Sequence, residues 1–242
     1  MKELYDNYYE EGFSLSKSQG LDLRSFELTA RKYRWNYRRF FSSLPKNAKI
    51  LDVGCGLGQF LYYLQKEGFS DVTGIDMSDT QIELALKMQP EVDLRHVKDS
   101  VNFFLQREEK YDVITMNDVL EHIEKDHLIS FLQALYRSLK PNGMIIVKTI
   151  NSAYPLSHAS RYLDLTHTIS FHEKSLTQLL RHVGFADVCC YQEEIGIYGT
   201  LFAIKKGVVT IVRLFIKMLV YFTESDWPNI ISANLIAIGN KK

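Results

Sequence analysis

Short apolar runs and amphipathic stretches alternate along the chain between residues 49 and 192. The apolar runs end at Gly, Asp or Asn, as buried strands often do. They predict strands at 49–53, 72–76, 93–97, 111–116, 143–149 and 186–192, with a last strand at 231–238. The amphipathic stretches predict helices at 58–67, 79–88, 100–107, 125–139 and 174–182, with a turn at 141–143. This alternation indicates an α/β fold with a mostly parallel sheet and right-handed crossovers.

A glycine-rich segment joins the first predicted strand to the first predicted helix, and it reads Ile50-Leu51-Asp52-Val53-Gly54-Cys55-Gly56-Leu57-Gly58-Gln59-Phe60. Its glycines allow a sharp turn and a close approach of the backbone to a ligand. A dinucleotide site has a glycine where Gln59 stands, and Asp52 would repel its pyrophosphate. A ligand with an ammonium and a sulfonium group would be attracted instead, which indicates S-adenosylmethionine. The segment resembles the first motif of class I S-adenosylmethionine-dependent methyltransferases.

Acids follow the next two strands in the order that this resemblance implies. Asp76 ends the second strand, where a carboxylate can accept both hydroxyls of a ribose. By resemblance, Asp99 meets the adenine amino group after the third strand. Either acid taken singly could be a helix N-cap or a turn residue. Their order behind Asp52 favours the cofactor, and the expected cofactor-binding residues are Asp52, Gly54, Cys55, Gly56, Gly58, Asp76, Met77, Asp99, Ser100 and Asn117.

The resemblance implies a Rossmann-like methyltransferase fold, with a mostly parallel seven-stranded sheet and helices on both faces. It also implies an N-terminal helical lid and a helical insertion before the last strand. We expect a single domain over residues 1–242, because a chain of this length can bury one substantial core. Its parts would be the lid (1–46), the cofactor-binding core (47–192) and the insertion with the last strand (193–242).

Composition narrows the partners and the compartment. The chain has 29 basic and 29 acidic residues, and a net charge of zero creates no field that would recruit nucleic acid. Cys55, Cys189 and Cys190 lack metal-binding spacing, and adjacent cysteines rarely pair, which favours a reduced compartment. The first residues carry no apolar signal core, and no run reaches the roughly 20 apolar residues of a membrane span. We therefore expect a cytoplasmic protein.

Residues 25–44 alternate aromatic and basic side chains, among them Tyr33, Arg34, Tyr37 and Arg38. One interpretation is a helical lid that places Tyr33 or Tyr37 over the methyl donor and directs the arginines at an anionic acceptor. The other is an amphipathic helix that docks on the sheet with a solvated basic face. The docked helix is favoured, because short basic clusters are common on ordinary helices.

Residues 208–222 are unusually apolar. Only Thr210, Arg213 and Lys217 are clearly polar, so a helix here has a narrow polar stripe and a broad apolar face. Fifteen residues are too few to span a bilayer as a helix. The apolar face could pack on its own domain, on a second subunit in a homodimer, or on a membrane surface as a peripheral contact.

Two histidines are candidate bases for an oxygen acceptor, whose proton must be removed. His122 lies in the stretch 117–123, which resembles the fourth-strand motif of small-molecule methyltransferases. His167 lies in Asp164-Leu165-Thr166-His167, which resembles a stretch of methyltransferases from polysaccharide and cell-surface glycan gene clusters. Either histidine could also be structural, but both fall on loops at the carboxyl edge of the sheet, where ligands bind. The catalytic candidates are thus His167, His122 and Asp164, the last to orient His167 or to bind an acceptor hydroxyl.

The same region supports a metal hypothesis. Asp118, Glu121 and His122 are similar to the acid-x-x-Glu-His metal-binding stretch of ubiquinone-pathway O-methyltransferases, although the first acid is Asp rather than Glu. Two carboxylates and an imidazole could hold a divalent ion that activates an acceptor oxygen. The shorter reach of Asp weakens this hypothesis, and in the favoured alternative, without a metal, the two acids cap and anchor the loop.

Three classes of function follow. The leading one is an S-adenosylmethionine-dependent O-methyltransferase acting on a sugar or glycan intermediate, which segment 161–171 favours; the apolar helix would suit a lipid-linked acceptor. The second is a quinone- or phenol-type O-methyltransferase that uses a divalent metal. A non-catalytic, cofactor-binding interaction protein is third, and the three intact cofactor acids argue against it.

Overall fold

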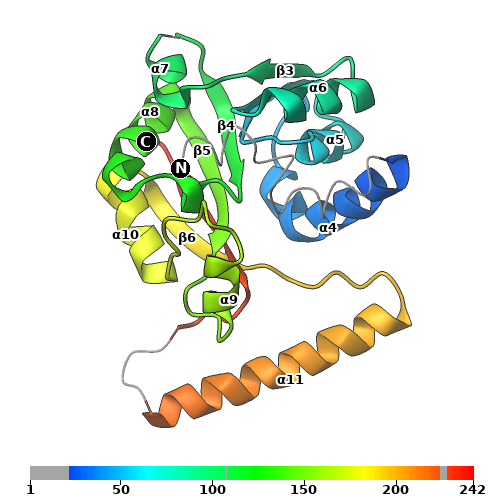
Figure 1. Ribbon diagram of the computed structural model, residues 1–242, viewed down its shortest axis with the longest axis vertical. Coiled ribbons are helices and arrows are strands. Elements are labelled where there is room, and N and C mark those ends of the chain that lie inside the picture. The colour runs from blue at the N-terminus through cyan, green and yellow to red at the C-terminus, as the bar shows by residue number, and fades with distance from the viewer. Residues whose placement is uncertain (1–21, 107, 224–227) are drawn as a thin grey trace.

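A seven-stranded sheet forms the centre of the molecule, in the order β3-β2-β1-β4-β5-β7-β6 (Figure 1). The structure, a computed structural model, describes residues 22–106, 108–223 and 228–242. β7 runs antiparallel to β5 and β6, and the other neighbouring strands are parallel, so the predicted sheet is confirmed. The strands are β1 Lys49–Val53, β2 Asp71–Asp76, β3 Asp93–His96, β4 Tyr111–Asn117, β5 Leu139–Ile150, β6 Ala186–Gln192 and β7 Asn234–Asn240.

Helices cover both faces of this sheet, as predicted. One face carries α7 (Ser100–Leu105), α8 (Leu128–Ser138) and α10 (Glu173–Val183), and the other carries α4 (Leu23–Phe41), α5 (Gln59–Lys66) and α6 (Asp79–Met88). Both faces of the central strands are therefore buried, and their sequences are apolar without strict alternation. In β1, Leu51 and Val53 pack into the first layer while Ile50 packs into the second.

Some element bounds differ from the sequence prediction for tertiary reasons. β5 starts at Leu139, which pairs with Tyr111, and the predicted turn at 141–143 lies inside this strand as an irregularity in register. β7 starts at Asn234 because the segment before it is held elsewhere: the Glu173 carboxylate accepts the backbone N–H groups of residues 229 and 230. The helix predicted at 125–139 begins as a 3-10 turn, η2 (Lys125–His127), before α8.

The described part of the predicted lid, α4, docks on the sheet beside α5. Its N-cap, Asp22, accepts the Ser25 N–H at 2.7 Å. Tyr37 is buried in the core, and the Tyr33 ring lies edge-on to Phe60 with centroids 4.9 Å apart. The favoured docked-helix interpretation is confirmed, and neither tyrosine lines the cleft described below. Burial selects this arrangement because the aromatic stripe of α4 matches the apolar face of α5. Residues 1–21 of the predicted lid lie outside the described residues.

The insertion before β7 forms α11 (Thr200–Thr223), which extends the predicted 208–222 helix in both directions. Figure 1 shows α11 apart from the body of the domain, beyond the short α9 (Ser157–Tyr162) that the sequence did not predict. The prediction that its apolar face packs on its own domain is therefore wrong for the described residues. No helix among residues 22–106, 108–223 and 228–242 is long and apolar enough to cross a membrane.

Candidate active site

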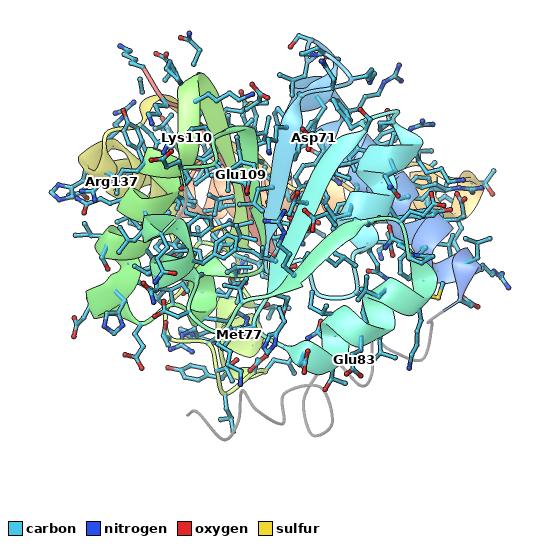
Figure 2. The ribbon with its side chains drawn as sticks, turned by 90° about the horizontal axis from the view of Figure 1, so that it is seen from above. Asp71, Met77, Glu83, Glu109, Lys110 and Arg137 are labelled. Atoms are coloured by element: carbon cyan, nitrogen blue, oxygen red, sulfur yellow. The ribbon has the colours of Figure 1, made fainter. Side chains whose placement is uncertain are left out.

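A cleft of about 770 Å³ opens at the carboxyl edge of the sheet, a volume typical of small-molecule sites. Figure 2 shows the two ends of β2 at opposite edges of the molecule, with Asp71 at the amino edge and Met77, just past the strand, at the cleft edge. Six of the predicted cofactor residues line the cleft, namely Gly54, Gly56, Asp76, Met77, Asp99 and Ser100. The structure thus brings together segments that follow β1, β2, β3 and β4.

The glycine loop is shaped by backbone conformations that other residues rarely adopt. Gly54 and Gly56 have φ values of 70° and 52°. A Cβ on Gly54 would lie 2.3 Å from Val119 Cγ2, and one on Gly56 would lie 2.7 Å from Gln81 Oε1. Both positions therefore require glycine, and the backbone they expose faces the cleft. Gly58 differs from them, because it caps α5 and does not line the cleft.

Asp76 supports this loop from the end of β2. Its carboxylate accepts the Gly56 N–H and the Ser78 N–H, each at 2.8 Å. Burial raises the pKa of this carboxyl, although the two backbone N–H groups act in the opposite direction. Each oxygen keeps a further lone pair, so the position suits the ribose hydroxyls that the sequence assigned to it. Asp99 caps α7 by accepting the Asn102 N–H at 3.0 Å through Oδ1, so the N-cap role is real and leaves Oδ2 for a ligand.

Asp52 lies behind the glycine loop rather than on the cleft wall, together with Cys55 and Asn117. Its Oδ1 accepts the Thr115 hydroxyl at 2.7 Å and the Asn117 side-chain amide at 3.5 Å. The Tyr37 hydroxyl donates to the amide oxygen of Asn117, which links α4 to this network. Burial raises the pKa of Asp52 to about 7. A buried carboxyl of this kind gains from a nearby cation, such as the ammonium group of the expected ligand.

Cys55 differs from the other predicted cofactor residues because its side chain belongs to the core. The thiol is buried, and burial raises its pKa well above the usual value. A Cβ on Gly74 of β2 would lie 2.8 Å from the Cys55 sulfur. Only the backbone of Cys55 is thus available to shape the loop, and its N–H donates to the Ile75 carbonyl at 3.0 Å.

The two candidate histidines lie against each other, and one of them lines the cleft. His122, on η1 (Leu120–His122), lines the cleft, and its ring centroid is 4.7 Å from that of His167. Ligand atoms of Glu121, His122 and His167 all lie within 4.8 Å of one another. The sequence placed both histidines at this edge and grouped Glu121 with His122 in the metal hypothesis, but it did not predict that His167 would join that pair. β4 and β5 are neighbours in the sheet, so the loops that follow them converge.

Hydrogen bonds assign the proton of each imidazole. The Thr166 hydroxyl donates to Asp164 Oδ1 at 2.7 Å, so it accepts from His122 Nδ1, 2.8 Å away. His167 Nδ1 lies 3.1 Å from the Ser160 carbonyl oxygen, which can only accept. In the neutral form of either ring, Nε2 therefore carries the lone pair. Asp164 is linked to His122 through Thr166, while His167 bonds to the backbone through Nδ1. The expected role of Asp164 toward His167 or an acceptor hydroxyl stays a prediction.

Asp118 does not join this cluster, which corrects the metal set of Asp118, Glu121 and His122. Its carboxylate pairs with Lys148 Nζ at 2.7 Å, and its backbone has a φ of 58°. Burial alone would lower the pKa of Lys148, but Asp118 and Glu193 raise it well above its usual value. Lys148 was not among the expected site residues; it does not line the cleft but pairs with Asp118, which does. A lysine within the otherwise largely apolar run 144–150 was the available signal.

A family model described as a methyltransferase domain matches residues 26–189. EEF1A lysine methyltransferase 2 of Danio rerio is 30% identical over 166 residues, which cover 62% of this chain and 68% of that protein. The ubiquinone biosynthesis O-methyltransferase of Histophilus somni is 37% identical over 115 residues, which cover 44% of this chain and 46% of the relative. This chain therefore matches less than half of the ubiquinone relative's length.

Solved structures share the fold at lower identity. An S-adenosylmethionine-dependent methyltransferase from Archaeoglobus fulgidus has a TM-score of 0.67 and 21% identity, with 89% of this chain and 94% of that chain covered. The plantazolicin methyltransferase BpumL, solved with SAH, has a TM-score of 0.58 and 21% identity, with 100% and 97% covered. Since the family model spans more than half of the sequence, the chain belongs to the methyltransferase-domain family and is a class I S-adenosylmethionine-dependent methyltransferase.

Proposed function

We propose that the enzyme methylates a hydroxyl oxygen of a small acceptor, and that Glu121, His122 and His167 hold a divalent cation beside it. The observation that carries this proposal is the convergence of their three ligand atoms within 4.8 Å. Two imidazoles and a carboxylate are a common catalytic ligand set for divalent transition metals. Metal-ligating histidines usually donate their other ring N–H to an acceptor that fixes the ring. Here the Thr166–Asp164 pair fixes His122, and a backbone carbonyl fixes His167.

The basicity of His122 favours coordination over direct proton abstraction. Burial and the neighbouring His167 lower its pKa to about 4, so the ring is neutral at pH 7 with an available lone pair. A phenol has a pKa near 10, about six units higher, and such an imidazole is a weak base toward it. A divalent cation would supply Lewis acidity that lowers the pKa of the acceptor. Burial raises the pKa of Glu121 to about 8, and a bound cation would favour the ionised carboxylate, which would supply negative charge to the site.

The cofactor supplies the methyl group on a sulfonium, and the remaining contribution of the chain is positioning. Gly54, Gly56 and Asp76 would hold the donor in the cleft, whose lining also includes His122. An in-line displacement depends mainly on contact between donor and acceptor and on exclusion of water. A phenol or quinol acceptor is the class that a cation at this cluster would serve best, and ubiquinone biosynthesis O-methyltransferases are among the curated relatives.

A sugar or glycan hydroxyl, including one on a lipid carrier, is the second candidate acceptor. Exposed apolar side chains at the same edge of the molecule favour it, because they would suit a lipid-linked substrate. In that case His122 or His167 would act directly as the base. The resemblance of Asp164-Leu165-Thr166-His167 to glycan-cluster enzymes supports the same acceptor class.

A labelled methyl donor offered with separate pools of phenols, lipid-linked sugars and protein substrates would identify the acceptor class. Chelation should abolish transfer, and added magnesium, manganese or zinc should restore it. His167→Ala should lower turnover about 10²–10⁴-fold while leaving donor affinity unchanged. His158→Ala is the matched control, because this exposed histidine of α9 lies outside the cluster.

Two results would separate the candidates. Full activity in chelator, combined with loss of activity in His122→Ala, would replace the cation with a direct base and favour the sugar acceptor. Labelling of protein lysine alone would contradict an oxygen acceptor altogether.

A further inference from the structure

We propose that α11 lies in the interface of an anionic membrane and directs the carboxyl edge of the sheet toward the lipid. The helix is 24 residues long, or about 36 Å at 1.5 Å per residue. Its sequence contains Lys205, Lys206, Arg213 and Lys217 and no acidic residue. A helix with a broad apolar face and a purely basic polar face is typical of interfacial binding.

Contacts with the domain fix the rotation of α11 about its own axis. Lys206 Nζ lies 5.2 Å from the ring centroid of Trp35 on α4, and 3.9 Å from the Glu194 carboxylate. Arg213, one heptad later on the same face, lies 3.6 Å from the same carboxylate. These pairs are weak in energy because they are partly exposed. They nevertheless turn the basic stripe toward the domain and leave the opposite face pointing away from it.

That opposite face is apolar and uncovered by the described residues. Ile204, Val208, Ile211, Phe215 and Met218 follow the spacing of one helix face, and each is more than half exposed. Lys205 borders this face, whereas Lys217, four residues after Arg213, lies with the basic stripe. A lysine such as Lys205 would sit at the level of lipid headgroups, with the apolar side chains below it.

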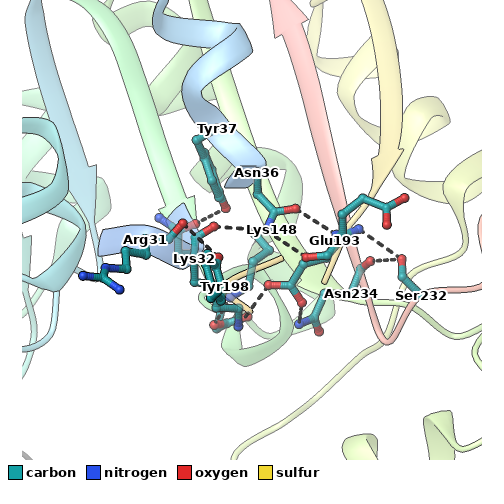
Figure 3. A network of polar contacts seen from close by, with 12 residues as sticks. Arg31, Lys32, Asn36, Tyr37, Lys148, Glu193, Tyr198, Ser232 and Asn234 are labelled. Atoms are coloured by element: carbon teal, nitrogen blue, oxygen red, sulfur yellow. Dashed lines mark hydrogen bonds and ion pairs between the residues drawn. The ribbon is translucent and has the colours of Figure 1, made fainter. Parts of the chain in front are cut away.

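The segment that leads from β6 into α11 is hydrogen-bonded to the domain, so the position of α11 is linked to that of the active site. Figure 3 shows the polar network that joins α4 to the segment after β6. Within it, the Glu194 N–H donates to Asn36 Oδ1 at 2.8 Å, and the Tyr198 hydroxyl donates to the Arg31 carbonyl at 2.9 Å. Glu193 pairs with Lys32 at 3.1 Å. A surface bound by α11 is therefore held at a defined place relative to the core.

Sheet topology puts that place beside the cleft. β6 runs parallel to the central strands and β7 runs antiparallel, so the insertion leaves and re-enters the sheet at its carboxyl edge. The cleft opens at the same edge. Segment 156–165 adds further exposed apolar side chains there, namely Leu156, Tyr162, Leu163 and Leu165. An acceptor that partitions into the membrane would thus reach the enzyme from the side on which α11 binds.

Charge decides between a membrane and a second copy of the chain. Lys206 and Arg213 pair with Glu194 on the domain side, but α11 itself carries four basic residues and no acidic residue, so two copies packed through their apolar faces would repel each other. An anionic lipid surface would attract the same charges, and lysines near the headgroups contribute to binding.

Flotation of the full chain with vesicles tests the proposal and needs neither methyl donor nor acceptor, so its result is separate from that of the proposed function. The chain should bind phosphatidylcholine vesicles that contain phosphatidylglycerol, and bind pure phosphatidylcholine more weakly. The triple variant Ile204→Gln, Ile211→Gln, Phe215→Gln should stay in solution. Its matched control replaces exposed leucines of α4 and α7 in the same way, and should bind like the unaltered chain: Leu23→Gln, Leu28→Gln, Leu105→Gln.

Separate measurements test the role of the lysines and the insertion of the apolar face into the bilayer. Lys205→Gln with Lys217→Gln should weaken binding to the anionic vesicles about ten- to thirtyfold, whereas Lys87→Gln with Arg137→Gln should not. Phe215→Trp should show a blue shift of tryptophan emission when vesicles are added, which tests insertion without the triple variant.

The proposal is overturned if the unaltered chain does not bind anionic vesicles or if the introduced tryptophan shows no shift. The unaltered chain could instead be a dimer in light scattering that does not bind vesicles, with the triple glutamine variant a monomer. That result would show that a second copy of the chain covers the apolar face of α11. Equal vesicle binding by the triple variant and its control would assign the contact to another surface.

Discussion

Asp52 should make this protein less stable as the pH rises, which is unusual for a carboxyl group. Burial raises its pKa to about 7 in the folded state, whereas an aspartate in the unfolded chain has a pKa near 3.9. Between these values the folded protein binds a proton that the unfolded chain has released. The contribution of Asp52 to the free energy of unfolding is therefore fully present below pH 4 and is lost as the pH rises through 7.

The size of the effect follows from the difference of about three pKa units, which corresponds to roughly 4 kcal/mol at pH 8. Asp52→Asn removes this titration and keeps an oxygen that can accept the Thr115 hydroxyl. Urea unfolding from pH 4 to pH 8 should show the free energy of unfolding rising in the variant relative to the parent as the pH increases. Asp71→Asn, at the exposed amino edge of β2, should leave the difference flat.

A parallel pH dependence of the Asp52→Asn variant and the parent would refute this reasoning. Donor binding gives an independent check, because an ammonium near Asp52 favours the ionised carboxyl. Affinity of the parent for S-adenosylmethionine should fall as the pH drops below 7, while the variant should bind weakly at every pH. Strong, pH-independent binding by the variant would remove Asp52 from the cofactor site.

Two further predictions concern the residues expected to bind the cofactor. Asp76→Ala should weaken S-adenosylmethionine binding at least tenfold in titration calorimetry, because charge-assisted hydrogen bonds contribute about 1.5–3 kcal/mol each; unchanged affinity would exclude Asp76 as the ribose ligand. Gly56→Ala should also lower the affinity, since its Cβ would lie 2.7 Å from Gln81 Oε1 and its φ is 52°. Adding Gln81→Ala should restore only part of that loss, because the backbone strain remains; full rescue would show that the clash alone was responsible.

The sequence by itself determined the elements whose signals are local. The strand–helix alternation is set by side-chain period, and the glycine loop by the conformations that Gly54 and Gly56 allow. Asp76 could be placed because it follows a strand directly and the carboxyl ends of parallel strands share an edge. These features require no knowledge of which distant residues come into contact.

Only the tertiary structure decided which loop residues act together. The adjacency of β4 and β5 brings Glu121 to His167, and a single threonine hydroxyl links Asp164 to His122. These contacts join residues far apart in sequence, and their distances depend on strand order and loop path. The same holds for α11: its apolar pattern was evident, but the direction in which that face points depends on contacts with Trp35 and Glu194.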